Sequence, residues 1–371
     1  MGNAGKVGVV LNRLAYVFRG LAEFRLRAAQ NPFNHVIGLR KTNAAIVRDL
    51  IVVYLRWGEI SSLYFSQRLD LIGRKVLKDY LPYQKFRMLR DRCNQSFTHE
   101  RSFNYICLLR DKLLFERYFH RGGLPLPTTR AVLKPNLNVD FEGLGNGDLF
   151  EVAHAFKIEK RYFCKLRFGI KGRGVFVLSI VDGEVRYNGT PIDRDSLCAL
   201  LDGEYLCQEI IDQAEEFEIL HPNSVNTLRI VTFRREAGFE LFASYLRIGC
   251  SGEIADNNDV SRVAVWVDPS TGVFNRTGFL IEGENPLSIE KHPDTGVRFE
   301  GKVVPRFEEC KALAFRAHAW LPAVHSVGWD FALAKDGFVL IEGNDDWGST
   351  IAMMLKDDFV PSFLECVRAT K

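Results

Sequence analysis

Residues 327–344, VGWDFALAKDGFVLIEGN, carry three oxygen-bearing side chains at a spacing suited to a hard cation. Ala-Lys-Asp-Gly between two apolar runs is a hairpin turn signal. If residues 335–337 form the loop, Asp330 and Glu342 lie opposite each other on antiparallel strands, with Cβ atoms about 5 Å apart. Asn344 follows Glu342 by two residues and points to the same face. The spacing predicts a Mg2+ site, and the alternative is an ordinary polar hairpin with a chance acid pair.

A second segment, CKLRFGIKGRGVFVL at residues 164–178, reads as a strand, a glycine-rich loop and another strand. Lys165 precedes the loop, which contains Lys171, Gly172 and Gly174. Glycines let backbone N–H groups approach phosphate oxygens, and the lysines add positive charge. The segment is not a P-loop, because G-x-x-x-x-G-K-[ST] is absent, and in a protein-kinase loop the lysine follows the glycines. A plain hairpin turn remains the alternative for this segment alone.

The elements that must hold these residues fall into two styles. From Leu11 to about Phe119, apolar residues recur at three- and four-residue steps and predict helices. RGGLPLPTT at 121–129 ends that pattern, because Gly-Gly and two prolines cannot continue a helix. Short β-branched and aromatic runs follow, interrupted by helical stretches near 191–202 and at 306–320. The sequence therefore predicts a helical front followed by an α+β body.

The order of the chemical parts is more specific than any one of them. Lys112 opens a predicted helix, Lys165 precedes the glycine loop, YLCQEII forms an apolar strand, NTLRIVTF contains Arg229, and the hairpin follows. In this order the chain resembles the ATP-grasp superfamily, from LLRDKLLFERYFHRGGLPLPTT through LIEGNDD.

Within that superfamily the chain is similar to the branch associated with sugar-transfer and polysaccharide loci. The segments that carry the similarity are HPNSVNTLRIVTF, YLRIG, ADNND, KHPDTG, VGWDFAL and, in the helical front, EISSLYFSQRL. The chain departs from the branch at Ser261-Arg262, where a Gly-Gly pair is expected. This departure alters a loop near the expected acceptor pocket, so it puts in doubt any substrate transferred from the family.

The resemblance implies an ATP-grasp fold, in which two α+β subdomains clamp ATP. Residues 1–110 would form a helical N-terminal region. Residues 111–205 would form the small lid subdomain with the glycine-rich loop, and residues 206–371 the C-terminal subdomain with the metal and acceptor sites.

The resemblance also implies roles on the nucleotide side of the cleft. Lys165 and Lys112 would neutralise the phosphates of ATP, and residues 169–174, including Lys171, Gly172 and Gly174, would cover the β- and γ-phosphates. The adenine would meet Gln208, Glu209, Ile210 and Ile211. Asp330, Glu342 and Asn344 would hold one or two Mg2+ ions, or Mn2+ in their place.

On the acceptor side, Arg229 would stabilise charge on an acyl phosphate and on the tetrahedral intermediate, with Lys165 as its catalytic partner at the phosphates. Asn226 and Thr227 would position the acceptor, and Arg247 and His221 would line its pocket. Each of these residues has a structural alternative. An ion pair on a sheet face would look the same for either arginine, and a satisfied loop residue would look the same for His221.

The resemblance implies an ATP- and Mg2+-dependent carboxylate–amine ligase that joins a small or sugar-linked carboxylate to an amine. Two alternatives stay open at this point. One is an ATP-grasp phosphotransferase acting on a hydroxyl, which would need the same lysines and metal ligands. The other is a non-catalytic nucleotide-binding protein of a polysaccharide system.

Composition limits the compartment and the partners. No apolar stretch is long enough to cross a bilayer, and eight scattered cysteines show neither zinc nor C-x-x-C spacing, so we expect a cytoplasmic protein with reduced thiols. Residues 1–120 carry 21 Lys/Arg against 9 Asp/Glu. The five tryptophans show no aromatic interleaving typical of nucleic-acid binding. We expect no nucleic-acid partner, whereas peripheral contact of the basic front with a membrane stays open beside a simple solvated face.

Overall fold

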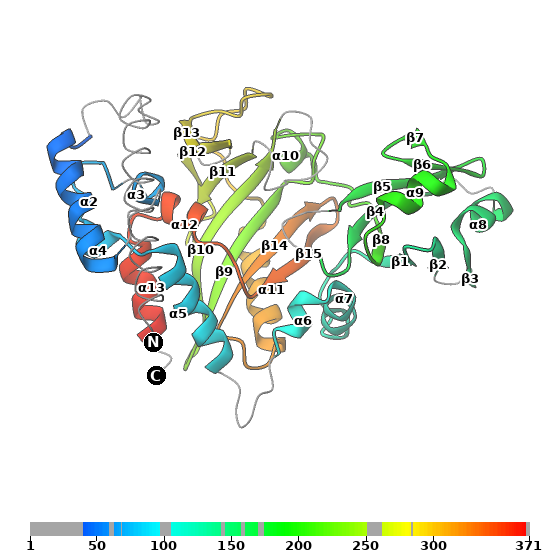
Figure 1. The fold of residues 1–371 in the computed structure, drawn as a ribbon, viewed down its shortest axis with the longest axis horizontal. Coiled ribbons are helices and arrows are strands. Elements are labelled where there is room, and N and C mark those ends of the chain that lie inside the picture. Colours follow the sequence, from blue (N-terminus) through cyan, green and yellow to red (C-terminus); the bar gives the residue numbers. More distant parts are fainter. Residues whose placement is uncertain are drawn as a thin grey trace, which may run out of the picture.

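Two antiparallel sheets lie side by side, and the N-terminal helices pack on the outer side of the larger one (Figure 1). This is a computed structural model, and it describes residues 40–58, 63–67, 69–96, 105–141, 145–156, 160–169, 174–250, 262–282 and 285–368. Among the helices in these ranges, none combines the length and the apolar character needed to span a lipid bilayer.

The described helices and strands follow the predicted order of a helical front and an α+β body. The helices are α2 (Asn43–Trp57), α3 (Leu63–Ser66), α4 (Val76–Asp79), α5 (Tyr83–Ser96), α6 (Cys107–Arg110), α7 (Lys112–Arg121), α8 (Leu149–Phe156), α9 (Arg194–Leu200), α10 (Glu215–Glu218), α11 (Phe307–Trp320), α12 (Thr350–Leu355) and α13 (Phe359–Arg368). The strands are β1 (Thr129–Leu133), β2 (Asn138–Phe141), β3 (Gly145–Asp148), β4 (Lys160–Leu166), β5 (Phe176–Val181), β6 (Glu184–Tyr187), β7 (Thr190–Pro191), β8 (Tyr205–Glu209), β9 (Thr227–Arg235), β10 (Gly238–Gly249), β11 (Arg262–Val267), β12 (Phe274–Glu282), β13 (Asn285–Ile289), β14 (Ser326–Ala334) and β15 (Gly337–Asn344).

The larger sheet has the strand order β13-β12-β11-β10-β9-β14-β15 and is covered on both faces. On one face Ile230 and Trp329 pack with α7 and α11, and on the other Val231 and Phe233 pack with α5, α12 and α13. Successive side chains of a strand point to opposite faces, so a strand buried on both sides reads as a continuous apolar run. This is why β9 has the sequence TLRIVTFRR, in which Arg229 interrupts the run.

The smaller sheet has the order β3-β2-β1-β8-β4-β5-β6-β7 and packs only one face against its own helices. Tyr162 and Cys164 of β4 lie in a core with Leu149 of α8 and Leu197 of α9. Because side chains alternate along the strand, Lys165 projects from the opposite face. The sequence pattern of β4 therefore places a buried lysine on the side away from α8 and α9.

The chain passes from the smaller to the larger sheet directly after β8. Gln213 forms an isolated bridge with Ala334, and the backbone N–H of Ala214 donates to the carbonyl of Leu333 at 2.8 Å. The helix α7 packs in the core of the larger sheet, whereas β8 belongs to the smaller one. The start of α7 lies next to the subdomain boundary expected between residues 110 and 111, and the start of β8 lies next to the one expected between residues 205 and 206. Both subdomain boundaries remain predictions.

Several elements were not foreseen from the sequence. The helical front is confirmed from α2 onward, while the prediction for residues 11–39 lies outside the described residues. The helices expected near 191–202 and at 306–320 are α9 and α11. The helices α12 and α13 were missed, and α13 contains Pro361, which the first turn of a helix tolerates because its N–H groups have no partner within the helix.

Asn94 of α5 ties the N-terminal helices to the larger sheet. Its amide nitrogen donates to the carbonyls of Ser326 at 3.1 Å and Asp345 at 2.9 Å, and its oxygen accepts from the Ser326 N–H at 2.8 Å. The side chain is buried, so replacing it leaves these backbone groups without partners in a dry site.

We expect Asn94→Ala to lower the free energy of unfolding by about 3 kcal/mol, because several buried polar groups lose their partners at once. Chemical denaturation measures this change. Arg92→Ala, an exposed position of the same helix, is the matched control and should change stability by less than about 0.5 kcal/mol. Equal stability of the two variants would show that Asn94 does not hold α5 to the sheet.

Candidate active site

The C-terminal hairpin pairs Asp330 with Glu342 as predicted, but its loop length and its register differ from the prediction. Asp330 of β14 is the register partner of Glu342 of β15, and Gly328 is that of Asn344. The loop has two residues rather than three, because Ala334 already pairs with Gly337. A register shift between Asp330 and Phe331 then supplies the missing offset. The predicted pairing is confirmed and the predicted loop length is wrong.

The three predicted metal ligands converge on one face of this hairpin. The Asn344 amide nitrogen donates to Glu342 Oε1 at 3.1 Å and lies 3.4 Å from Asp330 Oδ2. A half-turn of this amide would present its oxygen to the same point. Across the described part of the chain, no group of three or more His, Cys, Asp or Glu side chains is gathered for metal binding. The site offers two carboxylates and one amide, a donor set that suits Mg2+.

Arg229 forms a buried, two-pronged ion pair with Asp330. Its Nε donates to Asp330 Oδ1, and its Nη2 donates to Oδ2 at 2.6 Å. The two residues are register partners on β9 and β14, so the sheet itself aligns the fork with the carboxylate. Burial alone would lower the pKa of Arg229, but the charge of Asp330 raises it, so the guanidinium stays charged.

The two facing carboxylates have pKa values that are displaced in opposite directions. Burial raises the pKa of Asp330 to about 6, although Arg229 and Arg247 pull it down. Burial would also raise the pKa of Glu342, but a hydrogen bond with Asp330 and the charges of Lys112 and Arg229 lower it to about 2. Two buried acids that oppose each other repel, and a cation between them would relieve that repulsion.

Arg229 belongs to a polar face of the larger sheet, which we define as the side that carries Thr227, Arg229, Arg247, Arg262, Asp330, Glu342 and Asn344. Arg247 of β10 pairs with Thr227 and with Ala264, and its Nη1 lies 3.5 Å from Asp330 Oδ2. Arg262 precedes Ala264 by two residues on β11 and so points to the same side. Three arginines on adjacent strands thus share one face, while Ser261 lies outside the described residues.

Lys165 and Lys112 approach this polar face from the smaller sheet and from α7. Lys165 is buried, which lowers its pKa to about 8, while the charge of Glu342 acts in the opposite direction. Burial likewise lowers the pKa of Lys112, and Glu342 again opposes it. The same carboxylate therefore interacts with both lysines. Lys112 also donates to the carbonyl of Gly169, at the start of the glycine-rich loop.

The predicted glycine-rich loop is described only at its ends. Lys171 and Gly172 lie outside the described residues. Gly174 has φ of +69°, and a Cβ there would lie 3.0 Å from Tyr205 Oη. The left-handed backbone favours glycine, and a larger side chain there would press on Tyr205, whatever the loop binds.

The residues predicted to meet adenine lie at the end of β8. Gln208 is buried, and its amide nitrogen donates to Glu116 Oε2 at 2.7 Å. Glu209 is exposed and pairs with Arg130 at 2.7 Å. Ile210 is exposed and Ile211 is half-buried on the segment that crosses between the sheets. Contact of these residues with adenine stays a prediction.

Two predicted acceptor residues serve the fold. Asn226 is fully buried, and its amide nitrogen donates to the carbonyls of Phe217 at 2.8 Å and His221 at 2.9 Å. His221 is buried against Ser224 Oγ at 2.8 Å, and its ring centroid lies 5.6 Å from that of His292. Burial, followed by the charge of His292, lowers the pKa of His221. Contact of Asn226 or His221 with an acceptor stays a prediction.

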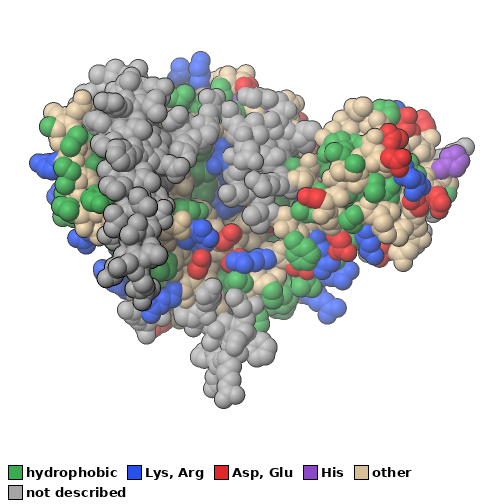
Figure 2. Space-filling view, viewed as in Figure 1, with side chains coloured by type: hydrophobic (Ala, Val, Ile, Leu, Met, Phe, Trp, Pro, Cys, Tyr) green, Lys and Arg blue, Asp and Glu red, His purple; other side chains and the backbone are tan. Residues whose placement is uncertain are grey.

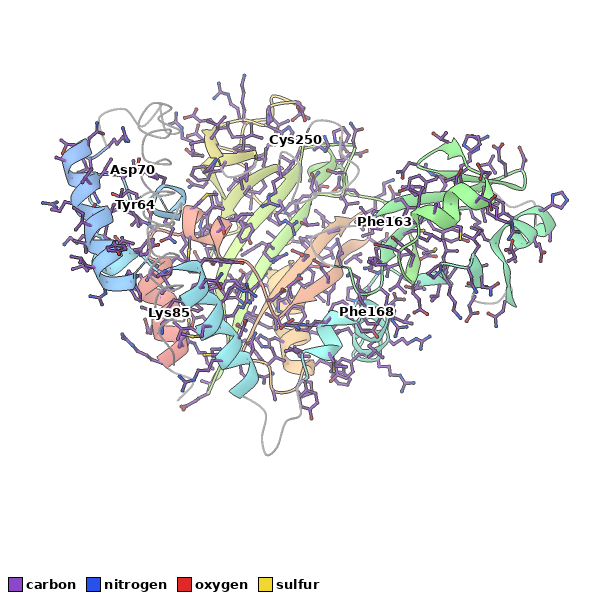
Figure 3. The ribbon with its side chains drawn as sticks, viewed as in Figure 1. Tyr64, Asp70, Lys85, Phe163, Phe168 and Cys250 are labelled. Atoms are coloured by element: carbon purple, nitrogen blue, oxygen red, sulfur yellow. The ribbon has the colours of Figure 1, made fainter. Side chains whose placement is uncertain are left out.

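Sequence reasoning missed two residues that shape this site. Glu116 lies one helical turn after Lys112 on α7, and besides Gln208 it accepts from the Thr129 N–H at 2.6 Å. Phe163 lies two residues before Lys165, so both point to the same face of β4, and Figure 3 shows it where the two sheets meet. The four-residue helical spacing and the two-residue strand spacing were the signals that could have identified them.

Comparison with known proteins gives one family match. The model of the family described as sugar-transfer associated ATP-grasp matches residues 93–367. A search of curated proteins found no match.

Solved structures show weaker likeness. One is D-alanyl-alanine synthetase A from Vibrio cholerae, with 11% identity, a TM-score of 0.40, and 72% of this chain and 66% of that chain covered. Another is VanG D-Ala:D-Ser ligase from Enterococcus faecalis, with 12% identity, a TM-score of 0.39, and 72% of this chain and 63% of that chain covered. A third is N5-carboxyaminoimidazole ribonucleotide synthetase from Thermotoga maritima, with 13% identity, a TM-score of 0.32, and 65% of this chain and 42% of that chain covered. The chain thus spans 42–66% of the length of these proteins, and likeness at this level adds nothing to the family match.

The family match agrees with the mixed helix and sheet architecture and with the helical region that precedes it. The predicted fold class, an α+β ATP-grasp fold after an N-terminal helical region, is confirmed. Because the family model matches most of the chain, the protein belongs to the sugar-transfer-associated ATP-grasp family.

Proposed function

We propose that the protein is an ATP- and Mg2+-dependent carboxylate–amine ligase that acts through an acyl phosphate. The observation that supports this most directly is the approach of the buried Lys165 and the half-buried Lys112 to a sheet face that holds Asp330, Glu342 and Arg229. Phosphoryl transfer needs positive charge around the phosphates and a way to hold the acceptor in line, and this arrangement offers both.

The proposed reaction has two steps. A carboxylate oxygen of the acceptor attacks the γ-phosphorus of ATP, the bond to the β-bridging oxygen breaks, and ADP leaves. An amine then attacks the acyl carbon, inorganic phosphate leaves with the former carboxylate oxygen, and the amine loses one proton. No covalent bond to the protein is formed.

The residues divide the work by position. Lys165 from the smaller sheet and Lys112 from the start of α7 would neutralise the phosphates. Asp330, Glu342 and Asn344 would hold Mg2+, or Mn2+, as one or two ions, and the metal would supply positive charge near the phosphates. Arg229, which is held by Asp330, would place its guanidinium beside the same carboxylate and would stabilise negative charge that develops on the acceptor.

The acceptor side of the polar face is basic. Arg247 and Arg262 point to the same side of the sheet as Arg229, which supports an anionic acceptor such as a small or sugar-linked carboxylate. The reaction would serve a polysaccharide assembly system in the cytoplasm, where ATP is available. The first alternative is phosphoryl transfer to a hydroxyl, which would use the same residues and yield no inorganic phosphate.

We expect the protein, given Mg2+-ATP and panels of carboxylic acids and amines, to release ADP and inorganic phosphate in equal amounts only when an acid and an amine are both present. Coupled ADP and phosphate assays measure this, and mass spectrometry identifies the amide. ADP release with a phosphorylated hydroxyl compound and no inorganic phosphate would establish the phosphotransferase instead.

We expect Glu342→Gln to reduce turnover by at least about 100-fold, because the amide keeps the shape but removes a charge needed by the metal. Glu308→Gln, on the exposed surface of α11, is the matched control and should retain full activity. Unchanged physiological activity of Glu342→Gln would leave the protein as a non-catalytic nucleotide-binding member of its assembly system.

We expect ATP binding to take up a proton between about pH 8 and pH 10. The pKa of Lys165 is about 8 in the free protein because burial lowers it, and a nearby polyphosphate would raise it. Lys165 is therefore mostly neutral above pH 8 until the nucleotide binds. Titration calorimetry in buffers of different ionisation enthalpy measures the uptake.

Lys165→Met should abolish this proton uptake and weaken ATP binding by roughly 10- to 100-fold. Lys160→Met, at the exposed start of the same strand, is the control and should bind ATP like the unmodified protein. The same proton uptake in Lys165→Met would assign it to another group.

A further inference from the structure

The helix α2 exposes a ridge of apolar side chains that the fold does not use. Ile51 and Leu55 are 53% and 77% exposed, and Val47 precedes them at the same four-residue spacing. On a helix this spacing places all three on one face. Ile72, shortly before α4, and Leu77, within α4, are 61% and 62% exposed.

The core face of α2 lies on another side of the helix. Ile46, Leu50 and Val53 are buried and form a small core with Tyr64 and Tyr80. The helix α2 therefore packs on its core without using the ridge. Exposing the apolar ridge to water is unfavourable, and the ridge does not stabilise the described fold.

Among the described residues 40–58 and 69–80, the acidic side chains are engaged within the protein. Asp49 accepts from Lys41 at 2.7 Å and from Tyr64 at 3.0 Å. Asp70 is buried and pairs with Arg40 at 3.5 Å. Asp79 is half-buried and caps the Lys75 N–H at 2.7 Å.

The exposed charged side chains of the described segment 40–58 and 69–80 are all basic. They are Arg48, Arg56, Lys75 and Lys78. Figure 2 shows apolar side chains at this edge of the molecule with Lys and Arg side chains beside them. We call these four residues together with Val47, Ile51, Leu55, Ile72 and Leu77 the basic apolar surface.

An apolar ridge bordered by positive charge fits a lipid bilayer with anionic headgroups. The apolar side chains would enter the interface between headgroups and acyl chains, and the basic ones would stay at the phosphates. A second copy would place positive charge against positive charge, which disfavours a symmetric dimer here. Nucleic acid would meet the charges but leave the aliphatic ridge in water.

We propose that the basic apolar surface docks the protein on an anionic membrane. The observations that carry this are separate from the catalytic proposal, and either can fail without the other. Figure 1 places α2 and α4 at the edge of the molecule far from the smaller sheet, so docking there would keep the smaller sheet away from the membrane.

The test is flotation of the full chain, without nucleotide, with phosphatidylcholine vesicles that contain or lack phosphatidylserine. We expect binding only to the phosphatidylserine vesicles, and we expect high salt to weaken it. Ile51→Ser with Leu55→Ser should reduce binding at least tenfold. Arg48→Glu with Arg56→Glu should reduce it at least fivefold for each charge changed, the equivalent of about 1 kcal/mol per basic residue.

Matched controls lie on the smaller sheet and its helices. Leu200→Ser removes an equally exposed leucine and Lys160→Glu reverses an exposed charge, and neither should change vesicle binding. All substituted side chains are exposed, so melting temperatures should stay within about 2 °C of the unmodified protein. If Ile51→Ser with Leu55→Ser alters folding, Arg48→Glu with Arg56→Glu still tests membrane binding by this surface.

Three results would overturn the proposal. One is the absence of binding to phosphatidylserine vesicles. Another is binding that neither α2 variant reduces, which would assign it to another part of the chain. The last is a doubled mass in solution that Ile51→Ser with Leu55→Ser abolishes, which would make this surface a contact between two copies.

Discussion

The buried ion pair between Arg229 and Asp330 is the interaction on which the site depends. Two charges withdrawn from water cost several kcal/mol each, and that cost is offset only when geometry and further hydrogen bonds are favourable. Here the sheet register aligns a two-pronged contact, and Arg247 and Asn344 lie close to the same carboxylate. Breaking this register would leave uncompensated charges in the interior, so the pair ties the chemistry of the site to correct folding of β9, β14 and β15.

The same strands separate this charge from the apolar core. Leu228 and Ile230 flank Arg229 in sequence, but alternation sends them to the opposite face, where Trp329 and Phe331 pack with them. One strand can therefore support both a dry core and a polar site. The smaller sheet uses the same device, since Lys165 projects away from the core that holds its neighbour Cys164. The short crossing after β8 connects the two sheets, and Lys165 of the smaller sheet comes close enough to Glu342 of the larger one to interact with its charge.

What the sequence could predict depended on how local the contact is. Asp330 and Glu342 are twelve residues apart in one hairpin, so turn chemistry and strand alternation predicted their pairing, although the register shift was not foreseen. The contact between Gln208 and Glu116 joins positions 92 apart, and no periodicity relates them. The burial of Asn226 was not foreseen because its partners, the carbonyls of Phe217 and His221, lie in a short segment just before it that no periodic pattern marks. The sequence could predict roles that depend on one supersecondary unit. It could not predict roles that depend on how the chain packs.

The division between the two sides of the cleft also bears on specificity. The nucleotide side consists of groups suited to any Mg2+-ATP complex, namely lysines and facing carboxylates. The acceptor side carries the departure of this chain from its family, because Arg262 stands where glycine was expected and its register places a guanidinium on the face of Arg247. Glycine would offer space and backbone N–H groups, while arginine offers a planar, permanently charged fork. Under the proposed function, we expect this change to alter the choice of acceptor rather than the chemistry at ATP.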